Sequence, residues 1–150
     1  MNNKKFLKVG FAYCNTARSF SKDPSSKVGA AILRPTGALV SSGWNGFAPG
    51  VEDTEARLSN REIKYSLMLH AELNAILTAN TDLTGCILFS YPYPPCAHCA
   101  SVIIKSGITR VISYAPEQIP ERWHENFKLA QEIFKEAKVE FEVLRELPKD

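Results

Sequence analysis

Apolar residues recur along the chain at spacings that alternate between helical and extended elements. An opening helix is predicted by apolar positions three and four apart, namely Phe6, Val9, Tyr13, Ala17 and Phe20. This helix is expected to end before Asp23-Pro24. Two short apolar runs, 28–33 and 38–44, flank the turn sequence Pro35-Thr36-Gly37, and together they predict a β-hairpin.

The rest of the chain continues the alternation. A polar loop is predicted over about 47–61, followed by apolar residues from Tyr65 and by a helix that begins near His70 and runs through Leu77. Strands are then predicted at 86–90, 110–114 and 139–144, and helices at 96–106, closed by Gly107, and at 123–137. The apolar stripe of the last helix is interpreted as a core face. This order predicts an α/β protein, a three-layer α/β/α domain with a five-stranded mixed sheet that spans residues 1–150.

Composition and charge narrow the range of functions. A chain of 150 residues, 45% of them apolar, can bury a core without help from a metal or disulfides, so a metal site here needs a functional explanation. The net charge of +2 is not gathered in runs, so neither nucleic acid nor a membrane surface is the expected partner, whereas a small anionic ligand is compatible. Because no export signal or stretch of about 18 apolar residues is seen, a cytoplasmic location is expected.

The four cysteines are therefore expected to be reduced, as metal ligands, a redox pair or buried apolar residues. Cys14 and Cys86 fall in a predicted helix and strand, where a buried thiol is the ordinary interpretation. His98 and His124 are expected at the surface.

Two short segments carry the candidate chemistry, His70-Ala71-Glu72 and Pro95-Cys96-Ala97-His98-Cys99, each at a predicted helix start. Two thiolates and one imidazole suit Zn²⁺, and three protein ligands leave the open fourth position that is typical of catalytic zinc. Glu72 can then act as a general base beside that position without binding the metal. A redox CxxC pair and a zinc-stabilised binding module for nucleic acid or protein are the alternatives, and the retained acid at Glu72 argues against the second.

The pattern H-x-E followed by P-C-x-x-C is the signature of zinc nucleobase deaminases. With the blocks Ser21-Lys22-Asp23-Pro24, Gly43-Trp44-Asn45-Gly46 and Lys64-Tyr65, the chain resembles the cytidine/deoxycytidylate deaminase superfamily, and within it the deoxycytidylate deaminases above all. The likeness covers most of the chain. Cytidine deaminases usually have Cys at the place of His70, and tRNA adenosine deaminases usually have Glu-Pro-Cys in place of Pro94-Pro95-Cys96, so both fit less well.

The resemblance implies a cytidine-deaminase-like fold and zinc-dependent conversion of dCMP to dUMP and ammonia. Glu72 would move the protons, the backbone of Ala71 would hold the pyrimidine carbonyl, and Asn45 would bind the sugar, although Asn before Gly46 is also a common turn residue. The alternative substrates are dCTP, cytidine or a modified cytosine nucleotide.

The substrate phosphate has several candidate ligands. Lys22 is the first candidate, Ser21 belongs to the same block, and the other candidates are Arg18, Arg61 and Lys64. Tyr91 is expected to stack on the base or line the pocket, as are Tyr93 and Phe47. The resemblance also implies a homo-oligomer and allows a deoxynucleoside triphosphate effector, although the fairly short stretch between Asn45 and His70 argues against the effector.

Overall fold

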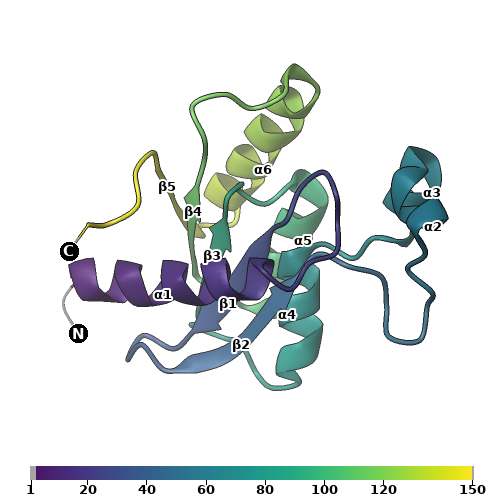
Figure 1. The fold of residues 1–150 in the computed structure, drawn as a ribbon. Helices are drawn as coiled ribbons and strands as arrows, with labels where there is room; N and C mark the ends of the chain where they lie inside the picture. Colours follow the sequence, from purple (N-terminus) through teal and green to yellow (C-terminus); the bar gives the residue numbers. More distant parts are fainter. Residues whose placement is uncertain (1–2, 150) are drawn as a thin grey trace.

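A five-stranded sheet forms the centre of the protein, with helices on both of its faces (Figure 1). The computed structural model describes residues 3–149. The strands are β1 (Gly29–Leu33), β2 (Leu39–Trp44), β3 (Ile87–Tyr91), β4 (Arg110–Tyr114) and β5 (Glu140–Leu144), in the spatial order β2-β1-β3-β4-β5. β1 is antiparallel to β2 and β3, whereas β3, β4 and β5 are parallel. The predicted α/β fold with a mixed sheet is therefore confirmed.

Helix α1 (Asn3–Arg18) covers one face of the sheet (Figure 1). Phe6 and Phe11 pack their rings against Phe89 of β3, with ring centroids 5.5 and 5.3 Å away. The helix approaches so closely that a Cβ atom at Gly10 would collide with the Phe89 ring. Only glycine therefore fits at that position without repacking.

Helices α4 (Ala71–Ala79), α5 (Ala97–Ser106) and α6 (His124–Glu136) cover the opposite face. The buried core there combines residues from all three helices, such as Ala75, Ile103 and Phe134, with Leu88 of β3 and other strand residues. Because parallel strands need crossover connections, α5 and α6 link β3 to β4 and β4 to β5. α5 follows the end of β3, and Leu69, just before α4, pairs with Gly46, just after β2, so both helices begin at the same end of the sheet.

The largest departure from the sequence prediction is the segment between Asn45 and His70. It contains two short helices, α2 (Glu55–Ser59) and α3 (Arg61–Leu67), which project from the body of the protein (Figure 1). Thr54 and Asn60 cap them, because each side chain accepts a hydrogen bond from the backbone N–H three residues later. The predicted polar loop and the apolar stretch from Tyr65 thus form a helical arm, and α4 begins separately at Ala71.

Several smaller predictions can be compared directly with the structure. Cys14 and Cys86 are completely buried, and His98 and His124 are exposed, as expected. A short 3-10 helix, η1 (Glu121–Trp123), precedes α6. None of the helices within residues 3–149 combines the length and apolar character needed to cross a membrane.

Candidate active site

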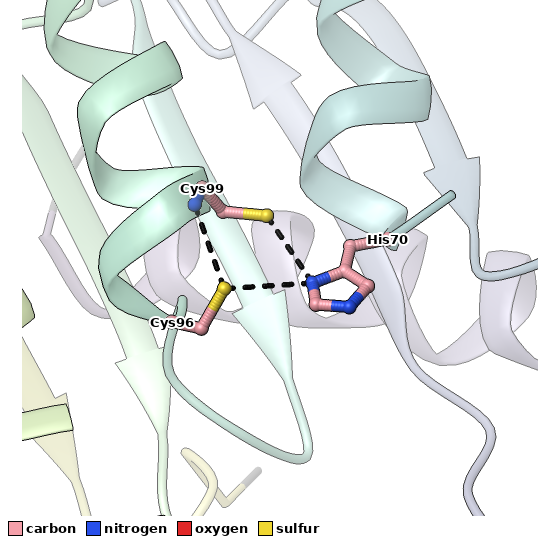
Figure 2. A group of neighbouring side chains, drawn as sticks. All are labelled: His70, Cys96 and Cys99. Carbon is pink, nitrogen blue, oxygen red and sulfur yellow. Dashed lines mark hydrogen bonds between the residues drawn. The ribbon is translucent and has the colours of Figure 1, made fainter. Parts of the chain in front are cut away.

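Three candidate ligands from two helix starts lie together, as Figure 2 shows. His70 immediately precedes α4, and Cys96 and Cys99 lie in the first turn of α5. The Nδ1 atom of His70 lies 3.5 Å from the Cys96 sulfur and 3.3 Å from the Cys99 sulfur. Among the described residues these three form a group of ligand atoms, all within 4.8 Å of one another.

Local backbone structure fixes these positions. Cys96 is the N-cap of α5, and its sulfur accepts a hydrogen bond from the Cys99 backbone N–H at 3.5 Å. A pair of hydrogen bonds between Gly46 and Leu69, 3.1 and 2.8 Å long, holds the chain just before His70 against the end of the hairpin. The motif spacing therefore places both sulfurs on one side of a helix N-terminus that favours negative charge.

The chemistry and spacing of this group fit Zn²⁺. With Zn–S bonds of about 2.3 Å and a Zn–N bond of about 2.1 Å, tetrahedral geometry separates nitrogen from sulfur by about 3.6 Å. The observed separations of 3.3 and 3.5 Å are close to this value. Hydrogen bonding from Cys99 and from His70 lowers the pKa of Cys96 to about 4, so a thiolate is already favoured there.

Glu72 lies in the first turn of α4, two residues from His70, and its side chain is only 4% exposed. Burial raises the pKa of its carboxyl group. Glu72 lines the same cavity as His70 and Cys96 but does not belong to the ligand group. The arrangement therefore offers an acid-base group beside a three-ligand metal site.

The metal site opens into a cavity of about 590 Å³, a size typical of small-molecule sites. Its walls come from five regions of the chain: the loop after α1, the end of the hairpin after β2, the arm formed by α2 and α3, the starts of α4 and α5, and the segment that begins at Pro120. Its polar, charged and aromatic lining residues include Asp23, Asn45, Arg61, Lys64, Arg122, Trp123 and Phe127.

Three of the predicted substrate residues lie at or beside this cavity. Asn45 and Ala71 line it, and both are buried. The Asn45 side chain holds the preceding loop, because its amide donates to the Ser26 carbonyl at 2.8 Å and its oxygen accepts from Val28 N–H at 2.9 Å. Ser21 is buried behind the wall, where its hydroxyl donates to the Asn45 carbonyl at 2.9 Å.

Two further predicted residues, Lys22 and Tyr91, lie away from the cavity wall. The Lys22 side chain is 71% exposed and forms an ion pair with Asp53 at 3.2 Å. Tyr91 packs against the ring of Tyr114 and lies under the Arg18 guanidinium. Of the other candidates, Tyr93, Lys64 and Arg61 do line the cavity.

Part of the cavity wall could not be predicted from the sequence. Trp123 and Phe127, assigned to a core face, are only partly buried, and their stacked rings, 5.8 Å apart, line the cavity together with Arg122. Only the later part of the stripe, at Ala130 and Phe134, reaches the core. No motif marks these residues; the one available signal is that they begin the helix that follows β4.

The known proteins that this chain resembles include zinc-binding deaminases. Residues 2–115 match the family model described as the cytidine and deoxycytidylate deaminase zinc-binding region. The chain is 44% identical over 139 residues to a protein of Aliivibrio fischeri named as an uncharacterized deaminase in the luxG 3′ region, covering 91% of each chain. The chain therefore belongs to the cytidine and deoxycytidylate deaminase family. It is a zinc-dependent deaminase, and the group formed by His70, Cys96 and Cys99 fits a Zn²⁺ cofactor.

Other proteins similar to this chain have names that state their substrate. The deoxycytidylate deaminase of Mus musculus is 36% identical over 129 residues, which cover 81% of this chain and 69% of that protein. The human deoxycytidylate deaminase is 40% identical, and the match spans 54% of its length. The structure of the dCMP deaminase from cyanophage S-TIM5 in complex with dCMP and dUMP is 25% identical, with a TM-score of 0.68, over 96% of this chain and 99% of that one.

Proposed function

We propose that this chain hydrolyses dCMP to dUMP and ammonia. The observation that carries the proposal is that His70, Cys96 and Cys99 form a zinc-type ligand set in the same cavity as buried Glu72. Similarity to deoxycytidylate deaminases, and to a structure that contains dCMP and dUMP, supports the choice of substrate.

The reaction replaces the C4 amine of cytosine with oxygen. Zn²⁺ bound by His70, Cys96 and Cys99 would supply a Lewis acid that lowers the pKa of the attacking water. Glu72 takes a proton from that water and delivers one to N3 as water adds to C4. Glu72 then carries the proton of the new C4 hydroxyl group to N4, so that the C4–N4 bond breaks, the C4 carbonyl forms and ammonia leaves as a neutral molecule. A single buried carboxyl group can serve both transfers because ring atom N3 and the exocyclic N4 are both bonded to C4.

Residues on the cavity wall would hold the substrate. The backbone of Ala71 would bind the pyrimidine carbonyl beside the metal site. Asn45 Oδ1 accepts one hydrogen bond from Val28 N–H, and a carbonyl oxygen has a second lone pair that can accept from a sugar hydroxyl. Ser21 would act indirectly, because its hydroxyl fixes the Asn45 backbone. Direct contacts of Lys22 and Tyr91 with substrate stay predictions.

The experiment measures ammonia release from dCMP, dCTP, deoxycytidine and cytidine by the zinc-loaded protein, with Glu72→Ala as a matched blank. Turnover of dCMP above the other three supports the proposal. Higher kcat/KM for a nucleoside would assign a nucleoside substrate instead. Absence of turnover on all four, with one zinc per chain, would favour a binding module and contradict the proposal.

The proposal includes a single domain over residues 1–150 that acts in the cytoplasm as a homo-oligomer. A reducing compartment suits the site, because Cys96 and Cys99 must be thiolates to bind metal.

Exposed apolar side chains are candidates for subunit contacts. Leu77, 63% exposed, and Phe20, 58% exposed, are the most accessible of those described. Light scattering tests the oligomer, and assays with added dCTP or dTTP test a triphosphate effector.

A further inference from the structure

The charged side chains on the cavity wall do not balance one another. The wall carries two carboxylates, Asp23 and Glu72, and three cationic side chains, Arg61, Lys64 and Arg122. Asp23 is neutralised by Lys64, whose Nζ lies 3.1 Å from its Oδ1, and both side chains are at least nine-tenths buried. Glu72 lies next to the metal ligands. Two guanidinium groups are therefore left without a compensating charge.

Neither arginine has an anionic partner within residues 3–149. No carboxylate lies within ion-pair distance of Arg61 or Arg122. The guanidinium carbon of Arg61 lies 5.2 Å from the centroid of the Tyr65 ring, a contact that leaves its charge uncompensated. Both side chains belong to exposed residues, so their donor groups can reach a ligand that enters the cavity.

The other cationic side chains near the site already have polar or anionic partners. Lys64 Nζ, besides its bond to Asp23, lies 3.3 Å from the Ser25 hydroxyl. Lys22 forms its ion pair with Asp53 away from the cavity wall. An anion at the cavity would therefore meet uncompensated positive charge at Arg61 and Arg122 first.

The segment that carries Arg122 is anchored to the metal-binding helix. Asn126 Oδ1 accepts a hydrogen bond from the Ala97 backbone N–H at 2.8 Å, in the first turn of α5 between Cys96 and Cys99. Trp123 stacks on Phe127 at an interplanar angle of 19°, which stiffens the start of α6. This hydrogen bond therefore fixes the position of the segment that carries Arg122 relative to Cys96 and Cys99.

The matched family includes deaminases of a nucleoside and of a nucleotide, so the zinc site alone cannot decide whether a phosphate is required. Arg122 lies outside the matched residues 2–115, and Arg61 lies on the projecting arm.

We infer that Arg61 and Arg122 form the phosphate subsite of this cavity and give the enzyme its preference for a nucleoside monophosphate. This inference rests on the proposed function. A phosphate monoester carries nearly two negative charges at pH 7, and arginine binds it with a planar, bidentate donor set.

The experiment measures, by calorimetry, the binding of dUMP and of deoxyuridine to the zinc-loaded protein. Replacing Arg122 or Arg61 by Gln removes a charge-assisted contact, so the Kd for dUMP is expected to rise about 10- to 100-fold relative to the Kd for deoxyuridine. Arg122→Lys keeps the charge but loses the bidentate geometry, so it should recover part of this loss.

One control variant and one rival variant separate this subsite from general charge effects. Arg57 is on the same arm, but its guanidinium donates to the Glu52 carbonyl at 3.0 Å and does not line the cavity. Arg57→Gln should change the dUMP Kd by no more than about twofold. Lys22→Gln tests the rival phosphate ligand that the sequence predicts. Loss of dUMP selectivity in Lys22→Gln, or its retention in both Arg61→Gln and Arg122→Gln, would overturn the inference. Equal weakening of both ligands would indicate a structural role and overturn it as well.

The binding assay does not depend on turnover. Failure of the wild-type protein to release ammonia from dCMP would refute the proposed function, whatever the arginine variants do. Normal dCMP turnover together with unchanged dUMP selectivity in the variants would refute only the phosphate subsite.

Discussion

The ion pair between Lys64 and Asp23 is predicted to hold the projecting arm against the cavity. Lys64 lies on α3, and among the described helices and strands α3 packs only on α2. The two charged side chains are 9% and 6% exposed, so almost no water reaches them. The substitution Lys64→Met keeps a long side chain but leaves the Asp23 carboxylate without its cation. We expect the arm to open more often as a result.

The structure sets the size of this effect. Breaking a buried ion pair by removing one partner costs about 3–5 kcal/mol. Asp23 keeps hydrogen bonds from the backbone N–H groups of Ser25 and Ser26, at 2.8 and 3.2 Å, and from the Asn45 amide at 3.3 Å. Because these donors still stabilise the carboxylate, we expect a loss of about 2–4 kcal/mol in the free energy of arm opening, or about 30- to 700-fold faster amide exchange.

Hydrogen exchange measured by mass spectrometry tests this value on peptides covering the arm and β3. Exchange should accelerate in the arm by the stated factor and much less in β3, which lies in the core. Lys22→Met is the matched control, because it breaks the exposed Lys22–Asp53 pair and should cost less than about 1 kcal/mol. Adding Asp23→Asn to Lys64→Met removes the uncompensated charge and should restore part of the protection.

Unchanged amide exchange in the arm of Lys64→Met, or a change no larger than that in Lys22→Met, would refute the role of the ion pair in holding the arm. Equal acceleration in the arm and in β3 would show that the pair stabilises the whole fold and does not act locally.

Three further predictions concern the metal site and its support. Gly43→Ala should lower the free energy of unfolding in urea by about 1–3 kcal/mol, because its Cβ would lie 2.6 Å from the Ala75 nitrogen; unchanged stability would contradict the close packing of α4 on β2. Cys99→Ser should abolish stoichiometric zinc by elemental analysis and make Tm insensitive to a chelator, and retention of one zinc per chain would remove Cys99 from the ligand set. Glu72→Gln should keep one zinc but lose about 10²- to 10⁴-fold in kcat for dCMP, whereas near-normal turnover would exclude it as the proton carrier.

The metal site could be predicted from the sequence because its determinants are local. Cys96 and Cys99 are three residues apart at a helix start, and His70 begins another helix directly after the arm. Sequence spacing alone therefore places each half of the metal site at the start of one helix. Only the meeting of the two halves depends on the fold, and the mixed sheet that brings them together also follows from the order of the elements.

The rest of the cavity wall depends on contacts between distant residues. Helix α3 is held by an ion pair between residues 41 positions apart, which no local pattern reveals. Helical periodicity at Trp123 and Phe127 shows which face is apolar, but it does not show whether that face meets a sheet or a cavity. Likewise, Ser21 and Asp23 are buried while Lys22 between them is exposed. The motif alone therefore does not show whether the Lys22 side chain points toward the cavity or toward solvent.

The most direct test of the account follows the conversion of dCMP to dUMP by absorbance, with ammonia measured in the same sample, before and after zinc is removed with a chelator. We predict one ammonia per dUMP, loss of turnover with the zinc, and recovery when Zn²⁺ is restored. Turnover that persists without zinc would contradict the role of His70, Cys96 and Cys99. A protein that holds one zinc per chain and leaves dCMP unchanged would contradict the proposed function itself.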